Sequence, residues 1–245
     1  MATESTGPRE LIPSAVAAEA TPKQQIDLFN RPPRGPWQLA WDRFKRAKLA
    51  IAGAIVLAVI VIGAVFAPQI APYGPNDIDL FSIKVSPGTG NHILGTDELG
   101  RDVFSRLLYG ARLSLWIGIA AALISTVIGV VLGAVAGFYG GITDGLLMRF
   151  VDLMLAFPSI FLLLVFFSVR GSSSVTWVIV LLGIFGWMWL TRIIRGEFFS
   201  LKERDFVEAA RMIGAPSHRI IGRHLLPNVT AAIIVSTTLN IAYYM

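Results

Sequence analysis

The 245-residue sequence contains no cysteine and little charge. The absence of cysteine excludes disulfide scaffolds, thiolate metal sites, iron–sulfur clusters and cysteine nucleophiles. Charged residues make up 15% of the chain and apolar residues 54%, whereas soluble domains carry about 25% charged and about 45–50% apolar residues. Composition therefore argues against a single water-soluble domain, and the high apolar content argues against an intrinsically disordered chain.

Motifs for catalysis and nucleotide binding are also missing. The sequence has no G-x-x-x-x-G-K-[ST] phosphate loop, no H-E-x-x-H and no G-x-S-x-G. The three histidines, His92, His218 and His224, lack the spacing of metal ligands. We therefore expect no catalytic residue, no metal site and no cofactor bound by this chain, and we do not expect an enzyme.

Charge is absent from five long apolar runs. A helix needs roughly 20 apolar residues to cross about 30 Å of hydrocarbon, and the runs are too long, and too unlike an alternating pattern, for barrel strands. The sequence therefore predicts an all-α integral membrane protein, a polytopic helical bundle, with a kink at Pro158 in the third span. The predicted spans are about 49–66, 113–139, 150–169, 172–191 and 226–245.

The remaining segments divide the chain into three parts. Residues 1–36 are predicted to form a disordered or extended tail, and residues 37–48 a basic segment next to the membrane. Residues 49–245 form the transmembrane domain, with long loops at 67–112 and 192–224. No cleaved signal peptide is expected, because the first apolar run follows a polar tail.

The basic residues favour one orientation. Of the 21 Lys and Arg residues, 16 lie on the side of the N-terminus and of loop 192–224, and five lie on the opposite side. The positive-inside rule therefore predicts a cytoplasmic N-terminus. The net charge of +5 is explained by this topology, so we expect no nucleic-acid partner.

The spans carry few polar features. No ionisable residue lies deep in any of them, which disfavours a channel or a secondary carrier that couples transport to protons or ions. Glycine recurs every fourth residue at Gly129, Gly133 and Gly137. Small residues at this spacing form a groove on one helix face, so these glycines are predicted to pack against another helix.

Loop 192–224 contains signals for two short helices. Asp205 is predicted to cap the first, with Glu208 as its capping-box partner, and Gly214 is predicted to end it. Ser217 is predicted to cap the second, which Pro227 bounds before the last span.

The first of these helices is too short to be stable alone in water, so we expect it to have a partner. An amphipathic segment lying on the membrane surface is the alternative interpretation. The apolar residues predicted to form the contact surface are Val207, Ala210 and Met212, and the charged residues are Arg204, Glu208 and Arg211.

The same loop resembles the E-A-A…G…L-P loop of ABC importer permeases. The glycine six positions after the glutamate, the Leu-Pro pair and the position between two spans all agree with that pattern. The resemblance implies that this loop couples the permease to an ATPase. The implied coupling residues are Glu208, Ala209, Ala210, Gly214, Leu226 and Pro227.

A second informative stretch lies in loop 67–112. From its residues alone it is predicted to be a short capped helix that leads into the second span, and an interfacial anchor helix is the alternative interpretation. Its string resembles the G-T-D-x-x-G-R-D-x-x-S-R-x-x-x-G-x-R-x-S-L signature of the C-type permease subunits of dipeptide, oligopeptide and nickel importers. The matching residues include Gly95, Thr96, Asp97, Gly100, Arg101, Asp102, Ser105 and Arg106.

The resemblance implies a type I ABC importer permease in a prokaryotic plasma (inner) membrane. Such a multi-pass subunit forms a heterodimer with a B-type permease, binds two cytoplasmic ATPases that hold ATP and Mg, and receives substrate from an extracytoplasmic binding protein. Members have six spans, one more than the five seen here. Peptides are the expected substrates. Nickel, glutathione or oligosaccharides are alternatives, and an intramembrane enzyme or assembly factor is the alternative from another class.

Overall fold

The computed structural model describes residues 36–170 and 174–245. Within these ranges the chain is helical and contains no strand, only isolated bridges between Thr89 and His92 and between Thr96 and Asp102. The predicted all-α class is confirmed. The tail predicted over residues 1–36 lies outside the described residues except for Pro36, where the first described helix begins.

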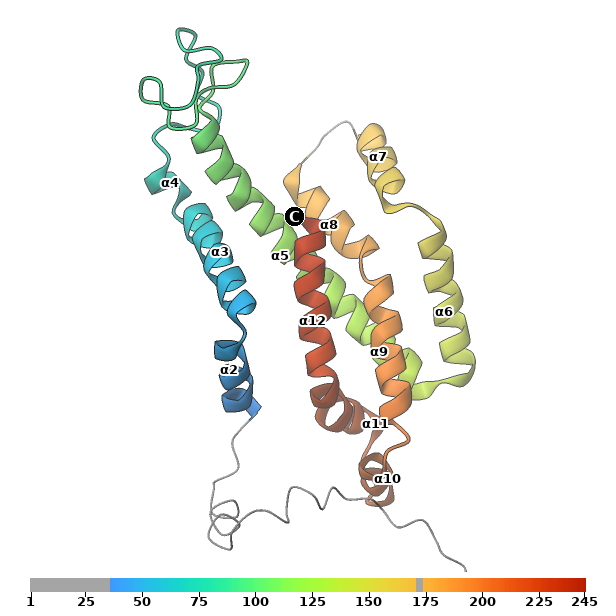
Figure 1. Cartoon of the computed structure of the whole chain (residues 1–245). Coiled ribbons are helices and arrows are strands. Elements are labelled where there is room, and N and C mark those ends of the chain that lie inside the picture. The colour runs from blue at the N-terminus through green and yellow to red at the C-terminus, as the bar shows by residue number, and fades with distance from the viewer. Residues whose placement is uncertain (1–35, 171–173) are drawn as a thin grey trace, which may run out of the picture. The chain divides into compact units, whose positions relative to one another are not determined.

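Figure 1 shows the order of the helices along the chain. They are α2 (Pro36–Arg46), α3 (Lys48–Val65), α4 (Ala67–Ile70), α5 (Val103–Tyr139), α6 (Gly141–Ala156), α7 (Ser159–Arg170), α8 (Val175–Phe185), α9 (Met188–Leu201), α10 (Asp205–Met212), α11 (Ser217–Arg219), the π-helix η1 (Ile220–Leu225) and α12 (Leu226–Tyr244).

Four helical stretches among the described residues are long and apolar enough to cross a membrane. A fifth candidate is the pair formed by α6 and α7, which is bent by 73° between Ala156 and Ile160. The bend includes Pro158, whose ring and missing N–H interrupt a helix, as predicted. The four unbroken stretches are Lys48–Val65, Val103–Tyr139, Val175–Leu201 and Ser217–Tyr244.

Three of these stretches extend well beyond the predicted spans, and the last of them begins at Ser217 rather than near residue 226. Helix α5 begins at Val103, so the predicted short helix and the predicted second span form one helix of 37 residues. At 1.5 Å per residue it is about 55 Å long, more than the hydrocarbon thickness. The stretch containing α8 and α9 continues to Leu201 and is interrupted at Gly186, where the Tyr244 ring occupies the space of a Cβ atom.

The chain divides into two compact units, residues 1–56 and 57–245. In the first, Trp41 of α2 stacks on Phe44 with ring centres 5.7 Å apart, and the Lys45 ammonium lies 5.2 Å from the centre of the Trp41 ring. The start of α3 is apolar and exposed, as at Leu49, Ile55 and Val56. Such a surface is typical of a helix in contact with lipid.

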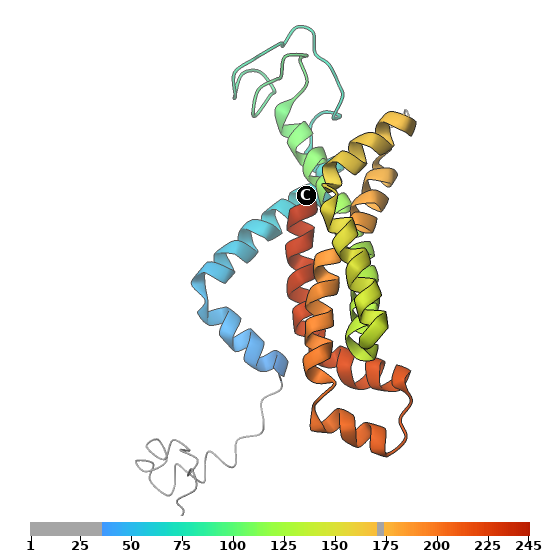
Figure 2. The same ribbon diagram turned by 90° about the vertical axis from the view of Figure 1, so that its right-hand side faces the viewer.

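In the second unit α5 is the central helix. It packs against α6, α8, α9 and α12, and α9 also packs against α6 and α12 (Figures 1 and 2). Buried side chains from α5, α9, α10, η1 and α12 form one apolar group, which we call the central cluster. Its members are Ala134, Phe138, Leu190, Ile194, Phe198, Val207, Ala210, Ile220, Leu225 and Val229.

The glycine stripe of α5 lies directly against α9. A Cβ atom at Gly133 would lie 2.7 Å from the Thr191 carbonyl oxygen and 2.8 Å from the Ile194 Cβ. Gly129 and Gly137 face the same helix at similar distances. Because real Cβ atoms do not approach this closely, glycine is what allows the two backbones to pack together.

Candidate functional sites

Helix α10 has an inner face that is buried in its own chain. Val207 and Ala210, three residues apart, lie on one side of the helix and belong to the central cluster. The Arg211 guanidinium lies 5.7 Å from the centre of the Phe138 ring. The prediction that Val207 and Ala210 present a surface to a partner is therefore wrong, because these side chains anchor α10 to the membrane helices.

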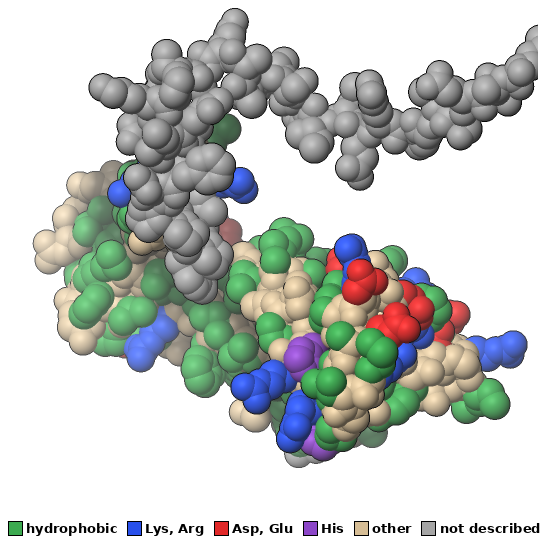
Figure 3. All heavy atoms as spheres, turned by 90° about the horizontal axis from the view of Figure 1, so that it is seen from below, with side chains coloured by type: hydrophobic (Ala, Val, Ile, Leu, Met, Phe, Trp, Pro, Cys, Tyr) green, Lys and Arg blue, Asp and Glu red, His purple; other side chains and the backbone are tan. Residues whose placement is uncertain are grey.

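The opposite face of α10 is exposed. It carries Glu208 and Ala209, and next to them Met212 and Ile213 are 78% and 85% exposed. Figure 3 shows acidic and basic side chains close together on this end of the molecule. A hollow of about 450 Å³ opens beside them, and it is lined by Lys202, Glu203, Glu208, Arg211 and Met212.

The start of α10 differs from the predicted capping box. Arg204 is the N-cap, with extended φ and ψ of −80° and 147°, and no side chain caps it. Its carbonyl oxygen accepts from the backbone N–H groups of Val207 (2.9 Å) and Glu208 (3.3 Å). The helix therefore starts one residue earlier than the capping box requires. Asp205 is its first residue, so Glu208 lies one position too far along to cap.

Gly214 ends α10, as predicted. Its φ is +77°, and its N–H donates to the Arg211 carbonyl oxygen at 2.9 Å, while the Ala215 N–H donates to the Ala210 carbonyl oxygen at 3.0 Å. These two bonds form a Schellman motif, in which a left-handed residue satisfies the last carbonyl groups of a helix.

The second predicted helix does not stop at Pro227. Pro216 is its N-cap rather than Ser217, and the helix continues through η1 into α12, where Pro227 occupies the first turn. The Leu226 N–H reaches back five residues to the Ile221 carbonyl oxygen. This wider turn precedes the proline, whose ring would clash with a regular preceding helical turn.

The two residues of the Leu-Pro pair have different surroundings. Leu226 is half-buried and packs against the central cluster, whereas Pro227 is exposed. The structure thus brings the coupling residues together at one end of α5, but with Ala210 and Leu226 turned inward and Glu208, Ala209, Gly214 and Pro227 exposed.

Two ion pairs join α6 to α9 near α10. Asp144 accepts two hydrogen bonds from Arg195, one of them 2.6 Å from Nη2 to Oδ2, and Asp152 pairs with Arg192. Sequence reasoning missed both pairs. Asp144, Asp152 and Arg192 border uncharged runs. No pattern in a single sequence, however, links α6 with residues that follow 51 and 40 positions later.

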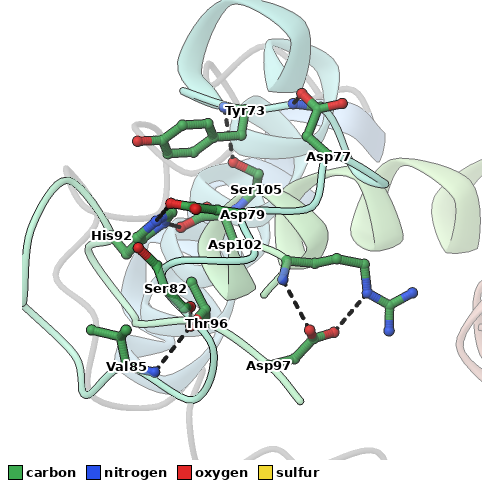
Figure 4. Close-up of polar contacts among 12 residues, drawn as sticks. Tyr73, Asp77, Asp79, Ser82, Val85, His92, Thr96, Asp97, Asp102 and Ser105 are labelled. Carbon is green, nitrogen blue, oxygen red and sulfur yellow. Dashed lines mark hydrogen bonds and ion pairs between the residues drawn. The ribbon is translucent and has the colours of Figure 1, made fainter. Parts of the chain in front are cut away.

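At the other end of α5, Asp97 organises the loop that carries the second motif (Figure 4). Its Oδ1 accepts from the backbone N–H groups of Leu99 (2.9 Å) and Arg101 (3.0 Å). Its Oδ2 accepts from Arg101 Nε at 2.8 Å and from Arg106. These bonds, led by that of the Arg101 backbone, hold the pKa of Asp97 well below its usual range.

Gly95 and Gly100 are required by this loop. Both have φ of +75°, a conformation that other residues adopt only with strain. A Cβ atom at Gly95 would collide with the Val85 carbonyl oxygen, and one at Gly100 with the Asp79 carbonyl oxygen. Next to Gly95, the buried Thr96 hydroxyl accepts from the Val85 N–H at 3.0 Å.

Asp102 starts α5 and holds a buried histidine. Its Oδ2 accepts from the Ser105 backbone N–H at 2.7 Å, and its Oδ1 lies 2.9 Å from His92 Nδ1. His92 stacks on Tyr73, and its Nε2 lies 3.9 Å from Asp79. Burial raises the pKa of Asp102, but the hydrogen bonds from Ser105 and His92 lower it more, so the net shift is downward. Sequence reasoning assigned no role to His92 or Asp79.

All eight signature residues therefore meet where this loop joins α5, and their bonds hold the loop in shape. In residues 36–170 and 174–245 no group of three His, Cys, Asp or Glu side chains is placed to hold a metal ion.

Comparison with known proteins identifies the family. Residues 129–245 match the family described as binding-protein-dependent transport system inner membrane component, and residues 35–87 match the N-terminal transmembrane domain of oligopeptide transport permease C. The dipeptide transport system permease protein DppC of Bacillus subtilis is 39% identical over 218 residues, which cover 89% of this chain and 68% of DppC. The chain belongs to this permease family.

Other relatives of this permease differ in the substrate that they are named for. The oligopeptide transport system permease protein OppC of Bacillus subtilis is 35% identical over 84% of this chain and 67% of its own. The glutathione transport system permease protein GsiD of Shigella flexneri is 42% identical over 85% of this chain and 68% of its own. The resemblance seen in the two motifs is confirmed, and the permease is a multi-pass inner-membrane protein.

Proposed function

We propose that this permease forms half of the translocation path of an ATP-driven peptide importer, and that α10 couples it to an ATPase. The observation that carries the proposal is the two-faced α10. Val207 and Ala210 anchor it in the central cluster, while Glu208 and Ala209 remain exposed. An element that is fixed on one side and open on the other can receive a force from a partner and pass it on.

The packing supports transmission from α10 into the spans. The central cluster joins α10 directly to α5, α9 and α12, and the glycine stripe keeps α5 and α9 in close contact. Closely packed interiors have low compressibility and transmit strain. Movement of α10 would thus displace these helices together, and the Asp144–Arg195 pair would carry α6 with them.

The orientation and partners follow from the same proposal. The excess of Lys and Arg on the side of α10 supports a cytoplasmic N-terminus and a cytoplasmic α10. The partners would be a B-type permease, two ATPases that hold ATP and Mg, and an extracytoplasmic binding protein. This chain would bind no nucleotide and carry out no hydrolysis.

Relatives named for dipeptide, oligopeptide and glutathione transport support a peptide substrate. Uptake of a labelled dipeptide by vesicles containing the reconstituted importer, with oligopeptides and glutathione as competitors, tests this assignment. Competition by nickel chelates or oligosaccharides, without competition by peptides, would overturn it.

The coupling role is tested by reversing one exposed charge. In the reconstituted importer, Glu208→Lys should reduce ATP-dependent uptake about tenfold or more, the effect of losing one hydrogen bond to a charged group. Glu197→Lys, an exposed glutamate on α9, is the matched control and should keep normal uptake. Normal uptake by a correctly assembled Glu208→Lys importer would refute the role of α10.

A further inference from the structure

A groove lies between the end of α3 and the start of α5, far along α5 from α10. Its volume is about 920 Å³, and we call it the α3–α5 groove. The lining residues include Val61 and Val65 of α3 and Arg106, Arg112, Trp116 and Ile119 of α5.

The lining changes in character along α5. Asn76, Arg106 and Arg112 contribute polar groups near the start of the helix, whereas Trp116 and Ile119 are apolar and lie one to two turns further on. The groove is thus cationic at the end next to loop 71–102 and apolar toward the membrane interior. None of its lining residues is acidic.

The positive charge of Arg112 is not neutralised within the described part of the chain, where no carboxylate lies within ion-pair distance of it. Arg106 differs, because it pairs with Asp97, although its side chain remains 41% exposed. Gly110 lies between the two arginines in the lining, and a Cβ atom there would meet nothing within 4 Å. The groove therefore has open space beside a cation that lacks an anionic partner.

The depth of these residues matches the surface of a bilayer. Arg112 precedes Trp116 by four residues, about 6 Å along a helix axis. Tyr109 and Trp116 line the groove on either side of Arg112, and Tyr and Trp are the residues that concentrate where hydrocarbon meets headgroups. In a bilayer this order would put Arg112 at the level of the headgroups and the apolar lining at the level of the acyl chains.

We propose that the α3–α5 groove binds an anionic phospholipid of the leaflet next to loop 71–102. Its phosphate pairs with Arg112, and one acyl chain lies between α3 and α5 against Val61, Val65 and Trp116. A transmembrane helix of a partner protein is the competing occupant. An apolar helix would enclose Arg112 without a counter-charge, which is costly in low dielectric, whereas a lipid supplies phosphate and hydrocarbon in the order that the groove presents.

Lipid retention by the assembled importer tests this proposal. The complex is reconstituted in phosphatidylcholine bilayers containing a minority of phosphatidylglycerol, extracted in mild detergent, and analysed for retained lipid by native mass spectrometry. Arg112→Gln should weaken phosphatidylglycerol retention about fivefold, the effect of one basic contact to an anionic lipid. Arg112→Lys should retain the lipid, as should the control Lys84→Gln, which removes a cation of the loop outside the groove.

A second measurement identifies a competing occupant. Because the chain has no native cysteine, Trp116→Cys gives this permease a single thiol for attachment of a photo-crosslinker. Capture of phosphatidylglycerol supports the proposal, and capture of a partner protein overturns it. Equal lipid retention by wild type and Arg112→Gln would also overturn it. Peptide uptake is measured separately, so failure here leaves the coupling role of α10 standing.

Discussion

At the scale of single residues, the structure depends on positions where a side chain would not fit. A Cβ atom added at Gly133 would lie 2.7 Å from the Thr191 carbonyl oxygen. That neighbour is backbone and cannot turn away, so any larger residue must separate α5 from α9. A Cβ atom added at Gly145 of α6 would have no neighbour within 4 Å. Gly145 therefore serves as the control position.

Gly133→Ala should therefore destabilise the permease by about 1–3 kcal/mol, the typical cost of overpacking. This corresponds to a fall in melting temperature of about 2–4 °C per kcal/mol. Gly145→Ala should be neutral or slightly stabilising, because alanine favours a helix. Thermal unfolding in detergent measures both variants. An equal melting temperature for Gly133→Ala and wild type would show that α5 and α9 are not tightly packed there.

The pKa of Asp97 gives the loop of residues 71–102 a defined response to acid. Its folded-state pKa is depressed by the N–H groups of Arg101 and Leu99. The resulting stabilisation is present above the usual aspartate pKa of about 3.9 and is lost progressively as pH falls from there toward the lower folded-state pKa. Pepsin cleavage in this loop, divided by the cleavage of an unfolded peptide at the same pH, should therefore rise progressively below about pH 4 in wild type.

Asp97→Asn removes this carboxylate at every pH, so its loop should be cleaved faster than that of wild type above about pH 4. Its rise on acidification should be smaller, because in this loop only Asp79 and Asp102 keep a depressed pKa. Asp77→Asn, an exposed aspartate in the same loop, is the control and should behave as wild type. If Asp97→Asn kept the full wild-type rise, another group would be responsible for it.

At the scale of elements, α10 is held by its C-terminal motif as well as by its inner face. Gly214 adopts φ of +77°, which costs another residue about 1–2 kcal/mol. Gly214→Ala should loosen the end of α10 and increase amide hydrogen exchange over residues 205–214. Gly222→Ala lies in the same region, at a helical position with open space, and should leave exchange unchanged. Unchanged exchange in Gly214→Ala would contradict the Schellman geometry.

The elements also show what a sequence can and cannot predict. The end of α10 was predictable because a glycine followed by a proline two residues on is a local signal. The burial of Val207 and Ala210 was not, because it depends on packing against residues of α5 such as Phe138, which are distant in sequence. Pro227 was misjudged for a related reason. Pro227 does not end the helix because the π-helix η1 precedes it, and a π-helix cannot be predicted from composition.

The signature loop shows the same division. Its sequence resembled a known pattern strongly enough to identify the family, and Gly95 and Gly100 are explained by left-handed turns. The pairing of His92 with Asp102 could not be predicted from the sequence, because ten residues separate them and only the folded loop brings them together. Charge-free runs predicted the membrane helices well, but the continuity of α5 from Val103 required the structure.

At the scale of the whole compact unit of residues 57–245, α5 joins the two sites. It starts at the signature loop with Asp102 as its cap and contributes Phe138 to the central cluster that holds α10. One continuous helix therefore connects the signature loop with the central cluster. The Asp144–Arg195 pair extends this unit to α6.

Charge reversal tests whether α6 moves with α9. Arg195→Asp alone should reduce ATP-dependent uptake, because it leaves two facing carboxylates, and the swapped pair Asp144→Arg with Arg195→Asp should recover part of it. A double-mutant cycle separates the coupling of the pair from the effect of each single change. No recovery by the swapped pair, in an importer that assembles normally, would show that the pair does not act as a unit.

The central claim, that the exposed face of α10 docks on an ATPase, is tested most directly by two adjacent alanines in this cysteine-free chain. Ala209 is exposed, and Ala210 is 4% exposed and belongs to the central cluster. In the assembled importer, a thiol crosslinker should join Ala209→Cys to the ATPase subunit and leave Ala210→Cys unlinked. Crosslinking at Ala210→Cys alone, or at neither position, would contradict the account.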